Sequence, residues 1–200
     1  MSKVTELLDR RVDAFVAAVN SSLREPLPAE EIPGPCKLSQ SDLPDWFDWR
    51  IVRSPSADWL PDLERRLPFR LPPTFRSLIA RYLFPSFEVG PLTMYSVGLS
   101  DPDPTGMELK CAIFADPHMS PFLLKNRLLA FARPADWSYD PVCFDLRPAS
   151  RKSEPAVLRI DHEEILCNER IRVVESISPA FQELMEEMTR QLQNKPAVNS

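Results

Sequence analysis

Glycine is scarce in this sequence, and the four glycines stand alone at positions 34, 90, 98 and 106. Loops that cradle the phosphates of a nucleotide need clustered glycines, because backbone amides must come close to the ligand. The sequence therefore argues against a Walker-type or dinucleotide-binding loop, and against nucleotide-dependent chemistry.

Paired cysteines and long apolar runs are also missing. The four cysteines, Cys36, Cys111, Cys143 and Cys167, form no Cys-x-x-Cys motif that would suggest a zinc site or a redox dithiol. The N-terminal run from Ala14 to Val19 is too short for a signal core, and no segment has the roughly 20 apolar residues that span a bilayer. We therefore expect reduced thiols and a cytoplasmic protein.

Positive charge is in deficit. Lysine and arginine number 24 against 29 acidic residues, for a formal net charge of -5 and an isoelectric point near 5.2. Proteins that bind nucleic acids or anionic membranes need a dominant positive field. We expect neither as a partner.

Proline is abundant, with 22 residues in a chain of 200 that is 44% hydrophobic. Proline fixes φ and shortens helices, so rigid, extended connections are expected. The length favours a single domain over 1–200. Within it we distinguish an N-terminal amphipathic helix in 1–25, a proline-rich acidic connector in 26–56, a core in 57–193 and a disordered tail in 194–200.

Hydrophobic periodicity predicts an α+β fold, with a single antiparallel or mixed sheet of five to six strands and flanking helices. Pro72 and Pro73 mark the beginning of a helix that ends before Pro85. A short helix is expected at 121–126. Pro179 marks the beginning of a last helix, expected at 181–192. The expected strands share alternating apolar residues and comprise 92–99, 107–115, 128–132, 136–146 and 155–164.

Four short segments follow one another in an order that is informative as a set: Leu71-Pro72-Pro73-Thr74-Phe75, Tyr139-Asp140-Pro141-Val142-Cys143-Phe144-Asp145, Ala156 to Glu163, and Ile177-Ser178-Pro179-Ala180-Phe181. This ordered set resembles the SUKH superfamily, which includes fungal regulators of cell-wall synthesis and bacterial toxin-immunity proteins. The resemblance covers about residues 60–192. It implies an α+β sheet without enzymatic activity that binds another protein.

Two groups of aromatic and acidic residues are candidates for partner binding. The first contains Trp46 and Trp49, which either form a hot spot for a basic partner or cover the sheet; we favour the second interpretation. The second group is Asp136, Trp137, Tyr139 and Asp140, where one aromatic residue could line a groove while the other joins the core.

The densest set of potential ligands is Asp161-His162-Glu163-Glu164 with Cys167. Zinc would need His162 joined by Cys143, Cys167 or an acid, and a nucleophilic triad would combine one of these cysteines with His162 and Asp161 or Asp145. We favour the interpretation that these residues form the polar end of a strand. We expect no catalytic residue, metal or cofactor. The seven arginines from Arg50 to Arg81, against three acidic residues, are interpreted as a solvated helix face rather than a contact for RNA or an acidic protein.

The leading hypothesis is a non-enzymatic protein-binding module, with an immunity protein that neutralises a cognate toxin by stoichiometric binding as its specific form. Its partner would be another protein, a basic toxin being one candidate. One alternative is a regulatory or scaffold protein. The other is a hydrolase or metal enzyme that uses His162 with Cys143 or Cys167.

Overall fold

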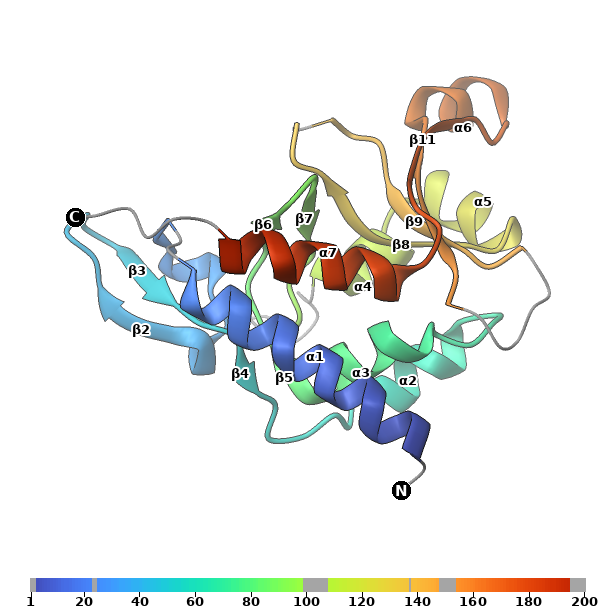
Figure 1. The fold of residues 1–200 in the computed structure, drawn as a ribbon. Helices are drawn as coiled ribbons and strands as arrows, with labels where there is room; N and C mark the ends of the chain where they lie inside the picture. Colours follow the sequence, from blue (N-terminus) through green and yellow to red (C-terminus); the bar gives the residue numbers. More distant parts are fainter. Residues whose placement is uncertain (1–2, 23–24, 99–107, 137, 148–153, 195–200) are drawn as a thin grey trace.

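The described part of the chain, residues 3–22, 25–98, 108–136, 138–147 and 154–194 of this computed structural model, combines seven α-helices with a six-stranded antiparallel sheet (Figure 1). The helices are α1 Lys3–Ser21, α2 Leu60–Arg66, α3 Pro73–Arg81, α4 Glu108–Phe114, α5 Met119–Lys125, α6 His162–Asn168 and α7 Phe181–Asn194. The predicted α+β class is thus confirmed.

The six-stranded sheet is a meander, in which each strand pairs with the one that follows it in the chain. Its order is β11-β10-β9-β8-β7-β6. Its strands are β6 Phe87–Val89, β7 Leu92–Met94, β8 Leu128–Pro134, β9 Val142–Asp145, β10 Ala156–Ile160 and β11 Val173–Ser178. Antiparallel neighbours can be joined by short connections, as β6 and β7 are, whereas α4 and α5 lie between β7 and β8 and α6 lies between β10 and β11.

Two smaller sheets precede the meander. One has the order β1-β3-β2 and the other pairs β4 with β5. Their strands are β1 Leu27–Pro28, β2 Lys37–Gln40, β3 Trp46–Trp49, β4 Val52–Arg53 and β5 Tyr82–Leu83, with 3-10 turns η1 Ala29–Glu31 and η2 Gly34–Cys36 between β1 and β2. The segment 26–56, which we expected to be a connector, therefore contains four short strands, each of them paired in one of the two small sheets.

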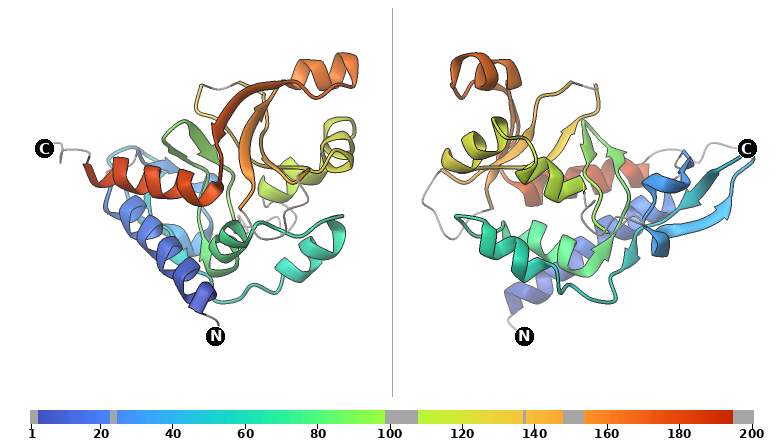
Figure 2. Two further views of the ribbon diagram at one scale, coloured as in Figure 1. Left: turned by 45° about the vertical axis from the view of Figure 1, so that its right-hand side comes forward. Right: turned by 180° about the vertical axis from the view of Figure 1, so that it is seen from behind.

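Side chains of the central strands alternate between two apolar layers, as the period of two in a strand requires. On β8, Leu129 and Phe131 join the main core, whereas Leu128 and Ala130 join a smaller cluster on the other face. Residues of α1, α3 and α7 complete the main core, and residues of α5 and α6 complete the smaller one. Figure 2 shows α1 and α7 on one side of the sheet and α5 and α6 on the other.

Four phenylalanines form the centre of the main core. The rings of Phe131 and Phe144 stack at 3.9 Å between centroids, with an interplanar angle of 11°. Phe181 from α7 meets Phe144 edge-on at 5.0 Å, and Phe75 from α3 lies at the same distance from Phe144. The aromatic contacts thus attach both helices to the sheet.

Helix α1 docks through an apolar stripe, as its sequence predicts, and through a polar cluster that the sequence does not reveal. Asp13 accepts hydrogen bonds from Arg81 at 2.7 Å and from the Tyr82 hydroxyl, and Asp9 accepts one from Ser77 at 2.7 Å. Burial and the nearby Asp13 carboxylate raise the pKa of Tyr82 to about 12, so its hydroxyl stays a donor. These bonds fix α1 against α3.

The predicted strand at 107–115 is wrong, because residues 108–114 form α4. Leu109 and Ile113 are buried, while Cys111, predicted to share their face, is exposed. Apolar residues at every second position include pairs spaced by four, so a short run fits either period. Of the strand expected at 92–99, only Leu92–Met94 is a regular strand among the described residues, and 195–200 of the predicted tail lie outside the described residues.

Glu154 links the beginning of β10 to the first turn of α3. Its Oε1 accepts hydrogen bonds from the backbone amide and the hydroxyl of Thr74, at 2.9 and 2.8 Å. Because a helix N-terminus carries unsatisfied amides and a partial positive charge, we expect Glu154→Ala to lower the free energy of unfolding by about 1 to 2 kcal/mol. Urea unfolding measures this, with Glu88→Ala as the matched control, because Glu88 is the exposed residue of β6. Equal effects of both substitutions would contradict the assigned role.

Candidate functional site

Asp136, Tyr139 and Asp140 of the second predicted group lie in the loop between β8 and β9, and of the strand predicted at 136–146 only Val142–Asp145 forms a strand, β9. The Ser138 amide donates to Asp136 Oδ1 at 3.1 Å, and the Asp140 amide donates to Ser138 Oγ at 3.0 Å. Such bonds between a short polar side chain and the backbone two residues on compete with strand pairing. Trp137 lies outside the described residues.

Arg159 on β10 holds this loop through hydrogen bonds to two aspartates. Its Nε donates to Asp140 Oδ2 at 2.8 Å and its NH1 to Asp136 Oδ2 at 2.9 Å. Asp140 is buried, with 7% of its surface exposed, whereas the Asp136 side chain is 56% exposed. One arginine therefore ties both ends of the turn to the sheet.

Asp140 stays ionised in spite of its burial. Burial alone would raise its pKa, but hydrogen bonds from the His162 ring, Arg159 and the His162 amide lower it to about 2. The hydrogen bonds that Arg159 donates to Asp140 and Asp136, opposed by desolvation, raise the pKa of Arg159. At neutral pH, Asp140 and Arg159 thus form a fully charged pair.

His162 is the third partner of Asp140, and it begins a helix rather than ending a strand as predicted. Its Nδ1 lies 2.8 Å from Asp140 Oδ1, and its amide donates to the same oxygen at 3.1 Å. Helix α6 begins there because Asp161 is its N-cap and accepts from the Glu164 amide at 3.0 Å. The Asp161-x-x-Glu164 spacing of a capping box could have revealed this helix in the sequence.

Two exposed side chains, Tyr139 and Leu166, and the partly buried His162 between them form a surface that we call the Tyr139 ridge. The ring centroids of Tyr139 and His162 are 5.9 Å apart, and Leu166 follows His162 by four residues on the same face of α6. Tyr139 is 83% exposed and Leu166 is 50% exposed. A large aromatic residue is thus presented to solvent on a fixed loop.

The first predicted group lies elsewhere, at the end of the molecule formed by β2 and β3 (Figures 1 and 2). Trp46 is 39% exposed on β3. Trp49 is 5% exposed, packs on Phe87 with ring centroids 5.7 Å apart, and donates from Nε1 to the Glu25 carbonyl. Trp49 is therefore a core residue, and the two groups do not form one continuous surface.

Neither cysteine proposed for catalysis is placed with His162 as a nucleophile and its base. Cys143 is buried on β9, where burial and then the Asp145 charge raise the pKa of its thiol and keep it protonated. Cys167 is exposed on α6, but five residues after His162 it points about 140° away around the helix. The geometry lends no support to the triad.

Asp140, Asp161 and His162 offer three potential metal ligands within 4.8 Å of one another. Both Asp140 oxygens already accept hydrogen bonds, from Arg159 and from His162. Asp161 bonds the Glu164 amide with one oxygen and Arg172 with the other, at 3.3 Å. The carboxylate oxygens of this cluster therefore already have hydrogen-bond donors within the protein. A cation would have to displace hydrogen bonds that hold the loop and α6.

Most of the seven arginines between Arg50 and Arg81 are paired in the described structure. Arg53 and Arg81 contact Asp13, Arg65 contacts Asp62 and Arg76 contacts Glu64. Arg66 lies over the ring of Phe114 at 3.8 Å. Ion pairs with carboxylates thus neutralise four of the seven arginines.

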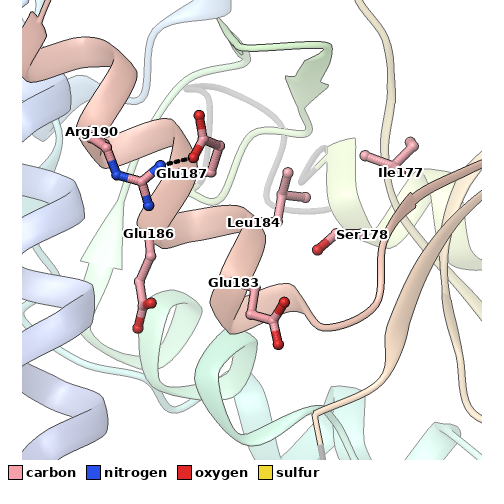
Figure 3. A pocket seen from close by; sticks show the side chains of 7 residues that line it. All are labelled: Ile177, Ser178, Glu183, Leu184, Glu186, Glu187 and Arg190. Carbon is pink, nitrogen blue, oxygen red and sulfur yellow. Dashed lines mark hydrogen bonds and ion pairs between the residues drawn. The ribbon is translucent and has the colours of Figure 1, made fainter.

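An open hollow of about 340 Å³ lies where β11 leads into α7 (Figure 3). It is lined by Ile177, Ser178, Glu183, Leu184, Glu186, Glu187 and Arg190. Glu187 is paired with Arg190, and Glu186 with Arg11 at 3.1 Å. These lining residues include no histidine or cysteine, so the hollow supplies neither of the groups proposed for nucleophilic catalysis.

Comparisons with protein-family models, with curated proteins and with solved structures find no match to this chain. Among the described helices, none is both long enough and apolar enough to cross a membrane.

Proposed function

We propose that this protein is a non-enzymatic, cytoplasmic binding module whose Tyr139 ridge contacts another protein. The carrying observation is the combination of an 83% exposed tyrosine with a loop held by Arg159 and Asp140. Tyrosine is among the residues that most often dominate binding energy at protein interfaces. Because Arg159 and His162 hold Asp140 in place next to Tyr139, less conformational entropy is lost there on binding, so more of the contact energy contributes to affinity.

The specific form that we propose is an immunity protein that covers the active site of a cognate toxin in a one-to-one complex. The SUKH resemblance supports this form, since Tyr139, Asp140 and Ala156 to Glu163 belong to the segments that carry it. The net charge of -5 favours a basic partner, because opposite net charges accelerate association. Asp136 and Glu163, both exposed beside the ridge, add negative charge there.

Affinity capture from the lysate of the source cells tests this function, with the wild-type protein compared with Tyr139→Ala. We expect one stoichiometric partner on the wild type. For that purified partner, loss of the ring should weaken binding about thirtyfold in Kd, which corresponds to about 2 kcal/mol. Leu7→Ala is the matched control, because Leu7 is 50% exposed on α1, far from the ridge.

The expected pattern is loss with Tyr139→Ala and retention with Leu7→Ala, followed by a toxicity assay of the partner for the immunity form. A partner bound equally by both variants would refute the ridge as the contact surface. Capture of no partner by folded bait would count against a dedicated binding module.

A further inference from the structure

The hairpin of β2 and β3, residues 37–49, exposes apolar side chains that no described element covers. Leu38, Leu43 and Trp46 are 44%, 53% and 39% exposed. β2 and β3 extend away from the main body toward one end of the molecule, opposite α5 and α6 (Figures 1 and 2). Exposed apolar residues gathered on one element are typical of an interaction surface.

The tip of this hairpin is held in one conformation. The Trp46 amide donates to the Leu43 carbonyl at 3.2 Å, and the Ser41 amide donates to the Trp46 carbonyl at 2.9 Å. Asp45 adopts a left-handed φ of 63°, and its carbonyl accepts from the Ala29 amide at 3.0 Å. Backbone hydrogen bonds thus hold the turn that carries the exposed side chains of Leu43 and Trp46.

Negative charge surrounds these apolar side chains. Within 25–50 there are six acidic residues and two basic ones. The acidic residues are all exposed and comprise Glu25, Glu30, Glu31, Asp42, Asp45 and Asp48. None of the six forms an ion pair with a described lysine or arginine, in contrast to Asp13, Asp62 and Glu64, which neutralise arginines between 50 and 81.

We infer that this hairpin, with the acidic residues around it, is a second binding surface that takes a lysine- and arginine-rich segment of another protein. Trp46 and Leu43 would contact the apolar parts of the segment, including the stems of its lysine and arginine side chains. The carboxylates would pair with the cationic ends, and would repel nucleic acids and anionic lipid surfaces. Because the hairpin and the Tyr139 ridge lie apart, the two surfaces act independently.

The test uses the full-length protein and a phage library of random twelve-residue peptides, selected on the wild type and depleted on Trp46→Ala. Selected peptides are then synthesised with a fluorescent label, and binding is measured by fluorescence anisotropy at 50 and 300 mM NaCl. Trp46 is partly exposed, so its replacement should not unfold the chain, which circular dichroism checks. Asp42→Asn/Asp48→Asn removes charge while keeping shape, and Tyr139→Ala is the control for the other surface.

We expect the selected peptides to be enriched in lysine and arginine relative to the starting library. Their Kd should rise at least tenfold with Trp46→Ala and with the double asparagine variant, rise with salt, and stay within twofold for Tyr139→Ala. Peptides without basic enrichment, or no selected peptide at all, would overturn the inference. An equal loss with Tyr139→Ala would overturn the independence of the two surfaces, whereas the capture experiment on Tyr139 tests the proposed function separately.

Discussion

Replacement of Asp140 by alanine is expected to lower the free energy of unfolding by about 2 to 4 kcal/mol. The substitution leaves Arg159, whose side chain is only 19% exposed, with the outer carboxylate of Asp136 alone. It also leaves the His162 amide and ring nitrogen without their common acceptor. Urea unfolding at pH 7, followed by circular dichroism, measures the loss.

Asp136→Ala is the matched control, because Asp136 pairs with the same arginine at 2.9 Å but is 56% exposed. Solvent-exposed ion pairs contribute little to stability, so this variant should remain close to the wild type. If both aspartates had the same effect, the burial of Asp140 would not be the reason for its importance.

The stabilising effect of Asp140 should depend on pH in a defined direction. Its pKa falls from 3.8 to about 2 on folding, so its contribution is complete above 3.8 and is lost as the pH falls toward 2. The shift corresponds to roughly 2 kcal/mol at neutral pH, of which about half remains at pH 3. The difference in unfolding free energy between wild type and Asp140→Asn should therefore shrink between pH 6 and pH 3. A difference that grows over this interval would contradict the lowered pKa.

Phe144→Ala should have the largest effect on stability, about 3 to 5 kcal/mol. Phe144 is fully buried and contacts Phe131, Phe181 and Phe75, so its loss opens a cavity between the sheet and two helices. Thermal and urea unfolding report the change, and the variant is expected to unfold at a clearly lower temperature.

Two companion variants calibrate this prediction. Phe144→Leu keeps much of the volume and should lose less stability than alanine. Phe47→Ala removes the same side chain from a half-buried position on β3, so its effect should be smaller still. If Phe47→Ala were as destabilising as Phe144→Ala, the four phenylalanines would not be the centre of the core.

The sequence predicts the class of the fold and those regular elements that have strong local signals, whereas α2, α6, β4, β5, β6 and β11 are not among the predicted elements. Prolines mark the beginnings of α3 and α7, and β8, β9, β10 and α5 follow from short apolar runs. It fails at α4, where seven residues fit both periods, and at β1 to β3, where proline and acidic residues conceal strands that are paired by long-range contacts.

The candidate site is only partly readable from the sequence. Asp136, Tyr139 and Asp140 stand together in the chain, so their proximity needs no fold. Arg159 comes to them only because β10 pairs with β9 in the register Arg159 to Val142, and Leu166 joins only because α6 begins at His162. The position of Arg159 depends on tertiary structure, whereas the N-cap at Asp161 is a local signal for the start of α6.

Site-specific photo-crosslinking tests the central claim most directly. A benzophenone amino acid in place of Tyr139 keeps an aromatic ring on the clamped loop, and the same group in place of Leu7 serves as the matched control. In lysate of the source cells, we predict one stoichiometric cross-linked protein from position 139 and none from position 7. Cross-linking from position 7 alone, or none from position 139 with the protein folded, would contradict a binding function of the Tyr139 ridge.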